Sequence, residues 1–414
     1  MPAPSQNSPA LRRTLSLPLI LLYGLWTTIG GGIYVLIGSV AARAGLNGLI
    51  SFMIAAFLIG FTALSYAELT SRFPVSAGSA VFVSRGFGHK RLGLLVGCLV
   101  VAAAVITASV LARGFAGYFH ILFEVPNWIS ILCVLTIVGL LAAWGIGESV
   151  MAASLVTVLE VAGLLIVLWA GQNAFLEFPQ RWHEFVPTWD WAAWSGIIGG
   201  TIIAFFAFIG FEDMVNVAEE VKNPETTLPL AIIATLVLTT LLYLAVAYVT
   251  LASVPLEQLQ GSEAPLALVA AGHSDRLAEL LAFIGTFAVL NGALIQIIMA
   301  SRVLYGMSRQ GWIHARLGRV HGRTQTPLLA TAMVTLTIMI LALSFPIGVL
   351  AQLTSLMVLL TGALVNGALL RLKFQKTHSG KGLSMPKFVP LLGTISNVSL
   401  ALLIIVDFVA PNLF

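Results

Sequence analysis

The sequence predicts an all-α, multi-pass membrane protein made of two inverted halves, each with one interrupted helix. Hydrophobic residues make up 58% of the 414 residues and charged residues only 9%, with a mean hydropathy of +0.98. A soluble domain carries about 25% charged residues. The apolar residues gather in stretches of roughly 20, the length at which a helix crosses a bilayer. The first and the sixth of these stretches are interrupted at membrane depth.

We expect about eleven membrane-spanning helices in a single domain, residues 1–414. A polar tail over residues 1–15 precedes them, and it lacks the apolar core and cleavage site of a signal peptide. The spans are expected near residues 17–42, 47–70, 92–122, 128–145, 149–171, 194–218, 228–254, 277–308, 326–344, 347–371 and 388–410.

The basic residues orient these spans. When the spans alternate, all of the 21 Lys and Arg residues except Arg43, Arg113, Arg181 and Arg276 fall on the side of the N-terminus. Cytoplasmic segments are enriched in Lys and Arg, so we expect a cytoplasmic N-terminus. The net charge of +4 then reflects topology and does not indicate a nucleic-acid partner. Short loops and compact termini favour the inner membrane of a bacterium.

The first span is interrupted by Gly30-Gly31-Gly32. Each glycine inside a helix costs roughly 0.5–1 kcal/mol relative to alanine, so three in a row indicate a break. Breaks at membrane depth are tolerated where the freed backbone groups face protein or a water-filled cavity. Two half-helices that meet there offer N–H groups and carbonyls to a small zwitterion. Close packing of neighbouring helices is the alternative explanation.

The sixth span is interrupted near Gly210, because Glu212 and Asp213 follow it at membrane depth. Burying Asp there costs roughly 2.5–3.5 kcal/mol on insertion scales, unless a new half-helix begins and its N-terminus favours the anion. The two breaks lie five spans apart, and an odd number of crossings reverses the orientation. The two halves, residues 16–172 and 193–371, therefore run in opposite orientations. Breaks at corresponding positions of two halves mark the binding site of a secondary transporter.

Four segments resemble the amino acid–polyamine–organocation (APC) superfamily of transporters, over nearly the whole chain. They are Ile29-Gly30-Gly31-Gly32-Ile33-Tyr34, Tyr66-Ala67-Glu68-Leu69 with Arg72-Phe73-Pro74, Phe208-Ile209-Gly210-Phe211-Glu212, and Tyr305-Gly306-Met307-Ser308-Arg309. The resemblance implies the five-plus-five inverted-repeat, LeuT-type fold of ten core helices, here followed by one extra helix at 388–410.

The resemblance also implies that an amino acid binds at the two breaks. The N–H groups of Gly31 and Gly32 would hold its carboxylate, and the carbonyls of Thr28, Phe206 and Ile209 its ammonium group. Phe206 would cover the substrate as an aromatic gate, although ordinary packing is the alternative for Phe206 and Phe208. The expected substrate-binding residues are Thr28, Gly30, Gly31, Gly32, Phe206, Phe208, Ile209 and Gly210.

Glu160 departs from the relatives, because several sodium-independent members carry a lysine at this place on the fifth span. Desolvation among Val, Leu and Ala disfavours a charged carboxylate, so Glu160 could take up and release a proton. It could instead hold a cation, or remain protonated and bonded to a neighbouring helix. Glu212 is expected either to link the sixth-span break to an outer gate or to cap its half-helix.

These features favour a secondary active transporter of amino acids that works by alternating access, is coupled to protons and prefers neutral substrates. The chain contains no Walker A motif, no cluster with metal-ligand spacing and no nucleophile–base group, so we expect neither ATP drive nor a metal, a cofactor or an enzymatic activity. A sodium-independent exchanger and a nutrient sensor that does not transport remain the alternatives.

Overall fold

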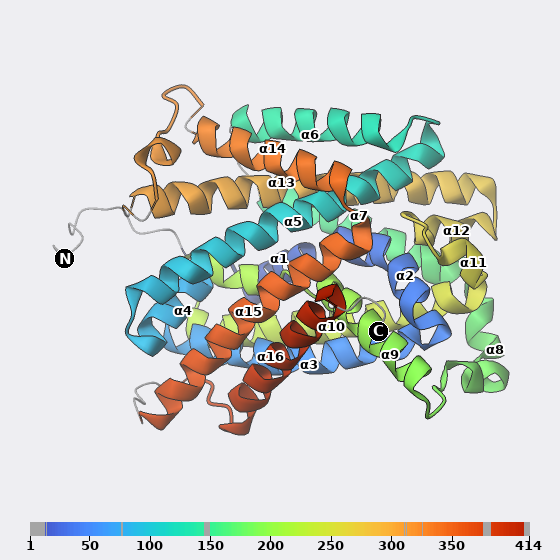
Figure 1. Cartoon of the computed structure of the whole chain (residues 1–414), viewed down its shortest axis with the longest axis horizontal. Helices are drawn as coiled ribbons and strands as arrows, with labels where there is room; N and C mark the ends of the chain where they lie inside the picture. Colours follow the sequence, from blue (N-terminus) through green and yellow to red (C-terminus); the bar gives the residue numbers. More distant parts are fainter. Residues whose placement is uncertain are drawn as a thin grey trace.

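The computed structural model describes residues 13, 15–75, 78–144, 150–309, 311, 313–324, 326–375 and 382–409. Of the expected tail over residues 1–15, only Arg13 and Leu15 are among them. Nearly all of the described chain is helical, and the long helices lie along one another in a single bundle (Figure 1).

The first half of the chain forms eight α-helices and two 3₁₀ helices. They are α1 (Leu17–Ile29), α2 (Gly31–Ala44), η1 (Gly45–Asn47), α3 (Gly48–Arg72), α4 (Gly78–Phe87), α5 (Lys90–Leu122), α6 (Asn127–Trp144), α7 (Val150–Ala170), α8 (Asn173–Arg181) and η2 (Trp182–Phe185).

The second half follows a similar plan. Its elements are α9 (Trp191–Ala207), η3 (Phe211–Glu220), α10 (Pro224–Ser253), α11 (Leu256–Leu259), α12 (Pro265–Ala271), α13 (Asp275–Arg309), η4 (Ala315–Gly318), α14 (Leu328–Ser344), α15 (Ile347–Phe374) and α16 (Phe388–Val409).

Every range predicted as a span holds a helix, but length and apolar composition identify fewer spans than the sequence predicted. Eight described helical segments are long and apolar enough to cross a membrane, or nine if the pair Thr157–Ala170 and Asn173–Phe185, bent by 59°, is one span. The difference arises for two reasons. α1 to α3 count as one continuous segment, and α14, with 17 residues, is shorter than the helices counted as spans. About eleven spans therefore stays a prediction.

Helices of the first half pack on their counterparts five spans later. α3 packs on α10, α5 on α13 and α6 on α14, while the broken first span contacts both parts of the broken sixth, α9 and η3. α5, α13, α6 and α14 form one side of the bundle in Figure 1. This pairing places the two breaks face to face in the middle of the molecule.

The two ends of the bundle differ in charge. One end, to the left in Figure 1, is where α3, α13 and α15 end and where α5 begins. We call it the basic end, because these helix ends carry Arg72, Arg309, Arg371 and Lys90. The other end carries the short helices α8, α11 and α12 (Figure 1).

The second break depends on Gly210. Its φ of +125° lies in a region that L-residues avoid, and a Cβ atom there would stand 2.0 Å from the Thr27 carbonyl oxygen. Gly210 therefore lets the sixth span turn while its backbone touches the end of the first.

We expect Gly210→Ala to lower the melting temperature of the purified protein in detergent. The unfavourable backbone conformation alone costs roughly 1–3 kcal/mol, and the collision with Thr27 adds to it. Gly306→Ala is the matched control, because a Cβ atom at this position on α13 meets nothing within 4 Å. Equal melting temperatures for the two variants would show that the break does not require this conformation.

Candidate functional site

The first break is a single residue long. α1 ends at Ile29 and α2 begins at Gly31, with Gly30 between them. The first N–H groups of α2 have no preceding turn to bond to, so those of Gly31 and Gly32 are free to bind an anion. A Cβ atom at Gly31 would lie 2.4 Å from Leu111 Cδ2 on α5 and 2.6 Å from Val289 Cγ1 on α13. Glycine is needed here because α5 and α13 press directly on the break.

The second break spans Phe208 to Gly210, between α9 and η3. Glu212 Oε2 accepts a hydrogen bond from the Gly210 N–H at 2.9 Å. Glu212 thus holds the turn as a cap would, and it lines a cavity on the side of the basic end. This contact is of the kind expected from the capping alternative, and a link to an outer gate stays a prediction.

A small pocket of about 50 Å³ lies between the two breaks. It is lined by most of the residues predicted from the sequence, namely Thr28, Gly30, Gly31, Gly32, Glu160, Phe206 and Ile209. Phe208 and Gly210 do not line it. The Phe208 side chain is fully buried with its ring centroid 5.3 Å from that of Tyr243, and Gly210 packs against Thr27.

Two of the carbonyls expected to hold an ammonium group already accept hydrogen bonds. Tyr243 Oη on α10 donates to the Thr28 carbonyl at 2.7 Å. The Ile209 N–H donates to the Phe206 carbonyl at 3.1 Å. These bonds satisfy backbone groups that the breaks would leave bare at membrane depth.

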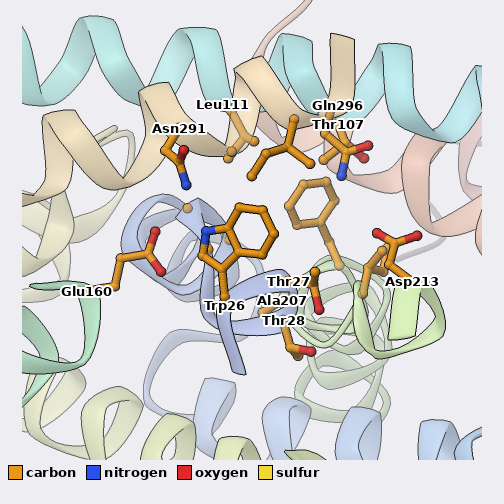
Figure 2. A pocket seen from close by; sticks show the side chains of 17 residues that line it. Trp26, Thr27, Thr28, Thr107, Leu111, Glu160, Ala207, Asp213, Asn291 and Gln296 are labelled. Atoms are coloured by element: carbon orange, nitrogen blue, oxygen red, sulfur yellow. The ribbon is translucent and has the colours of Figure 1, made fainter. Parts of the chain in front are cut away.

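Glu160 reaches the pocket from α7. Its side chain is 1% exposed, and Oε2 has no hydrogen-bond partner among the residues that the structure describes. Its backbone carbonyl accepts a hydrogen bond from Tyr34 Oη at 2.5 Å, which ties the middle of α7 to α2 just after the first break. Figure 2 shows the carboxylate pointing into the pocket.

Trp26 and Asn291 also line the pocket, and Trp26 is not among the binding residues expected from the sequence. Within the described part of the chain, Trp26 Nε1 and Asn291 Nδ2 are buried without partners, as Glu160 Oε2 is. In Figure 2 the indole, the amide and the carboxylate turn toward one another. Trp26 lies four residues before Gly30, on the helix face that leads to the break, and this spacing could have identified it.

A second cavity, of about 660 Å³, extends from the pocket toward the basic end. Trp26, Thr27, Thr107, Ile209 and Gln296 are among the residues that line both spaces. The pocket is therefore the inner end of this wider cavity.

At the opposite end of the bundle, an ion pair joins α5 to the segment between α11 and α12. Arg113 Nη2 on α5 donates to Glu263 Oε1, between α11 and α12, at 2.7 Å, and its Nη1 donates to the Ala342 carbonyl at 3.1 Å. Asn127 Nδ2 binds the other carboxylate oxygen of Glu263 at 3.1 Å. Among the described residues, the wide cavity is the space that joins the pocket to the basic end.

Comparison with known proteins identifies similar sequences. The sequence profile of the family described as "Amino acid permease" matches residues 19–414. The branched-chain amino acid permease BcaP of Bacillus subtilis (strain 168) is 28% identical over 93% of this chain and 86% of its own length. The methylthioribose transporter of the same organism is 28% identical over 94% of this chain and 87% of its own length. A vacuolar cationic amino acid transporter 2 from Arabidopsis thaliana is 31% identical over 88% of this chain, which spans 60% of that protein.

The fold is shared with a solved transporter structure. A mutant of the manganese transporter of Eremococcus coleocola superposes with a TM-score of 0.62 over 95% of this chain and 87% of its own, at 16% sequence identity. At this identity the likeness concerns the fold alone, and it confirms the predicted fold class of an all-α, five-plus-five inverted repeat with interrupted first and sixth spans.

We expect Tyr243→Phe to lower the stability of the protein by about 1–3 kcal/mol, because it leaves the buried Thr28 carbonyl without its partner. Thermal unfolding in detergent measures the change. Tyr305→Phe on α13 is the control, since no hydrogen bond of its hydroxyl is seen among the described residues. A Tyr243→Phe protein as stable as this control would mean that the Thr28 carbonyl is satisfied in another way.

Proposed function

The chain belongs to the amino acid permease family, and we propose that it carries small neutral amino acids across a membrane by alternating access, coupled to protons through Glu160. Membership of this family makes it a multi-pass membrane transporter and not an enzyme. The observation that carries the finer proposal is the buried pocket between the two breaks, with free N–H groups on one wall and a buried carboxyl on another.

The pocket is suited to the carboxylate of an amino acid. The N–H groups of Gly31 and Gly32 stand at the N-terminus of α2, where the aligned peptide dipoles favour an anion. The close approach of α5 and α13 leaves no room for a side chain at Gly31. A ligand at this point would therefore contact bare backbone.

The size of the pocket favours small substrates. Its volume of about 50 Å³ is small, on the order of a few water molecules. Leu111 and Phe206 bound it with apolar surface, so a short uncharged side chain fits better than a long cationic one. The relatives include branched-chain and cationic amino acid transporters, so the substrate panel below covers both classes.

Alternating access accounts for a cavity that reaches the pocket from one end of the bundle. The cavity of about 660 Å³ reaches the basic end, whereas the ion pair of Arg113 with Glu263 bridges the other. Since basic residues collect on the cytoplasmic side, we place the basic end and the N-terminus in the cytoplasm of a bacterium and regard this conformation as open inward. Movement of the two broken spans against the remaining helices would close this end and open the other.

Glu160 is the proposed coupling residue. It is buried in the pocket wall, its Oε2 lacks a partner, and no basic side chain is among the described residues that line the pocket. Keeping a lone carboxylate ionised in a buried site costs free energy. Glu160 would therefore take up or release a proton when the pocket opens to one side of the membrane or the other.

We expect proteoliposomes containing the protein to take up small neutral amino acids, and a proton gradient to alter the rate. Glu160→Gln should abolish the response to the gradient, because the amide cannot titrate. The panel comprises alanine, serine, leucine, arginine and methylthioribose, with Glu279→Gln, an exposed carboxylate on α13, as the control variant. If amino acids exchanged at a rate that did not depend on the proton gradient, Glu160 would not be the coupling residue. If amino acids bound to the protein but were not taken up, the protein would be a sensor.

Phe206→Ala should weaken amino acid binding by roughly tenfold or more, because the ring forms one wall of the pocket. Phe205→Ala is the matched control: its ring is equally buried but does not line the pocket, so its loss should reduce stability more than affinity. Titration calorimetry on the two purified variants separates the effects, and equal losses of affinity would refute a special role for Phe206.

A further inference from the structure

We propose that the carboxylate of Glu160 binds the ammonium group of the substrate directly, so that an amino acid and a proton compete for the same group. This inference rests on the proposed function, and it gives the direction of the coupling: each amino acid that binds displaces a proton. The protein would then exchange amino acids against protons and would not carry the two together.

Two of the three backbone carbonyls expected to hold an ammonium group already accept a hydrogen bond. Thr28 O is bonded to Tyr243 Oη and Phe206 O to the Ile209 N–H. An ammonium group brings three donors and no acceptor. In the pocket, Glu160 Oε2 is a buried acceptor without a partner.

The donors around Glu160 are complementary to the other end of the zwitterion. Trp26 Nε1 can only donate, and it is buried without a partner, as Asn291 Nδ2 is. Both turn toward the same space as the Glu160 carboxylate (Figure 2). Together with the N–H groups of Gly31 and Gly32 they can surround a carboxylate. A metal ion or a lone ammonium ion would leave these donors unsatisfied.

None of the described ionisable residues around Glu160 is a cation that pairs with its carboxyl. α1, α10, α12 and α13 pack on α7. The phenol of Tyr34, from α2, bonds the Glu160 carbonyl, and Tyr243 of α10 interacts with Glu160 electrostatically. α1 adds Tyr23 and α12 adds no ionisable group. The charged residues of α10 and α13 lie toward the helix ends, namely Glu225, Asp275, Arg276, Glu279, Arg302 and Arg309.

Asp213 is the other carboxyl that lines the pocket, and Asn216 Nδ2 donates to its Oδ1 at 3.4 Å. With two acidic groups and no basic group among the described lining residues, the pocket favours a cation. Before a substrate binds, Glu160 is expected to be protonated, because an ionised carboxylate buried without a partner costs free energy.

The binding step balances in protons. The protonated carboxyl of Glu160 loses its proton to water in the cavity toward the basic end, and the resulting carboxylate accepts hydrogen bonds from the incoming ammonium group. One proton is released for each amino acid bound. Linkage then requires that protons weaken amino acid binding by the same factor by which the amino acid weakens proton binding.

Isothermal titration calorimetry of the full-length protein with L-alanine, in buffers of different ionisation enthalpy at pH 4.5 to 8, tests this inference. Toward the acid end, we expect about one proton released per alanine and a Kd that rises tenfold for each unit by which the pH falls. Glu160→Gln should release no proton and should bind alanine roughly ten- to hundredfold more weakly. Glu279→Gln should behave as the wild type.

Lactate, which has a hydroxyl in place of the ammonium group, is the matched ligand, and it should fail to displace alanine from the wild type. Proton uptake on alanine binding, or wild-type affinity in Glu160→Gln, would overturn the assignment of Glu160 while leaving amino acid transport intact. If none of alanine, serine, leucine and arginine bound to the wild type, the proposed function itself would fall, and this inference with it.

Discussion

The structure depends on one constraint: a backbone polar group at membrane depth needs a partner. Each broken span frees N–H and C=O groups in the middle of the bundle, and the fold satisfies them in different ways. Tyr243 bonds the Thr28 carbonyl, Glu212 bonds the Gly210 N–H, and a tight turn bonds the Phe206 carbonyl. The N–H groups at the start of α2 face a small pocket instead, and this residual capacity defines the candidate site.

The remaining architecture keeps that pocket small. α5 and α13 press on Gly31, and Gly210 lies against Thr27, so the two breaks are held together by contacts that only glycine permits. The ion pair of Arg113 with Glu263 bridges one end, and the wide cavity leaves the other accessible. Buried polar groups inside such a space interact more strongly than in bulk water, because the protein interior has a lower dielectric constant. We propose that the Glu160 carboxyl then governs which ligand binds.

The sequence predicted the features that have a local cause. Three consecutive glycines, two carboxylates after Gly210 and a lone Glu160 among apolar residues each violate an expectation for membrane helices, and each lies at the site. It could not predict contacts between distant helices. Tyr243 engages a carbonyl 215 residues away, and Asn291 and Trp26 meet Glu160 only in the folded bundle. Likewise, Phe208 looked equivalent to Phe206, but the turn of the break directs it toward Tyr243.

The most direct test of the account is an experimental structure of the protein with L-alanine bound. We expect alanine to bind between the two breaks. Its carboxylate should accept hydrogen bonds from the N–H groups of Gly31 and Gly32, and its ammonium group should lie within hydrogen-bond distance of Glu160. Alanine bound in the wide cavity away from both breaks, or bound at the breaks with Glu160 turned away, would contradict it.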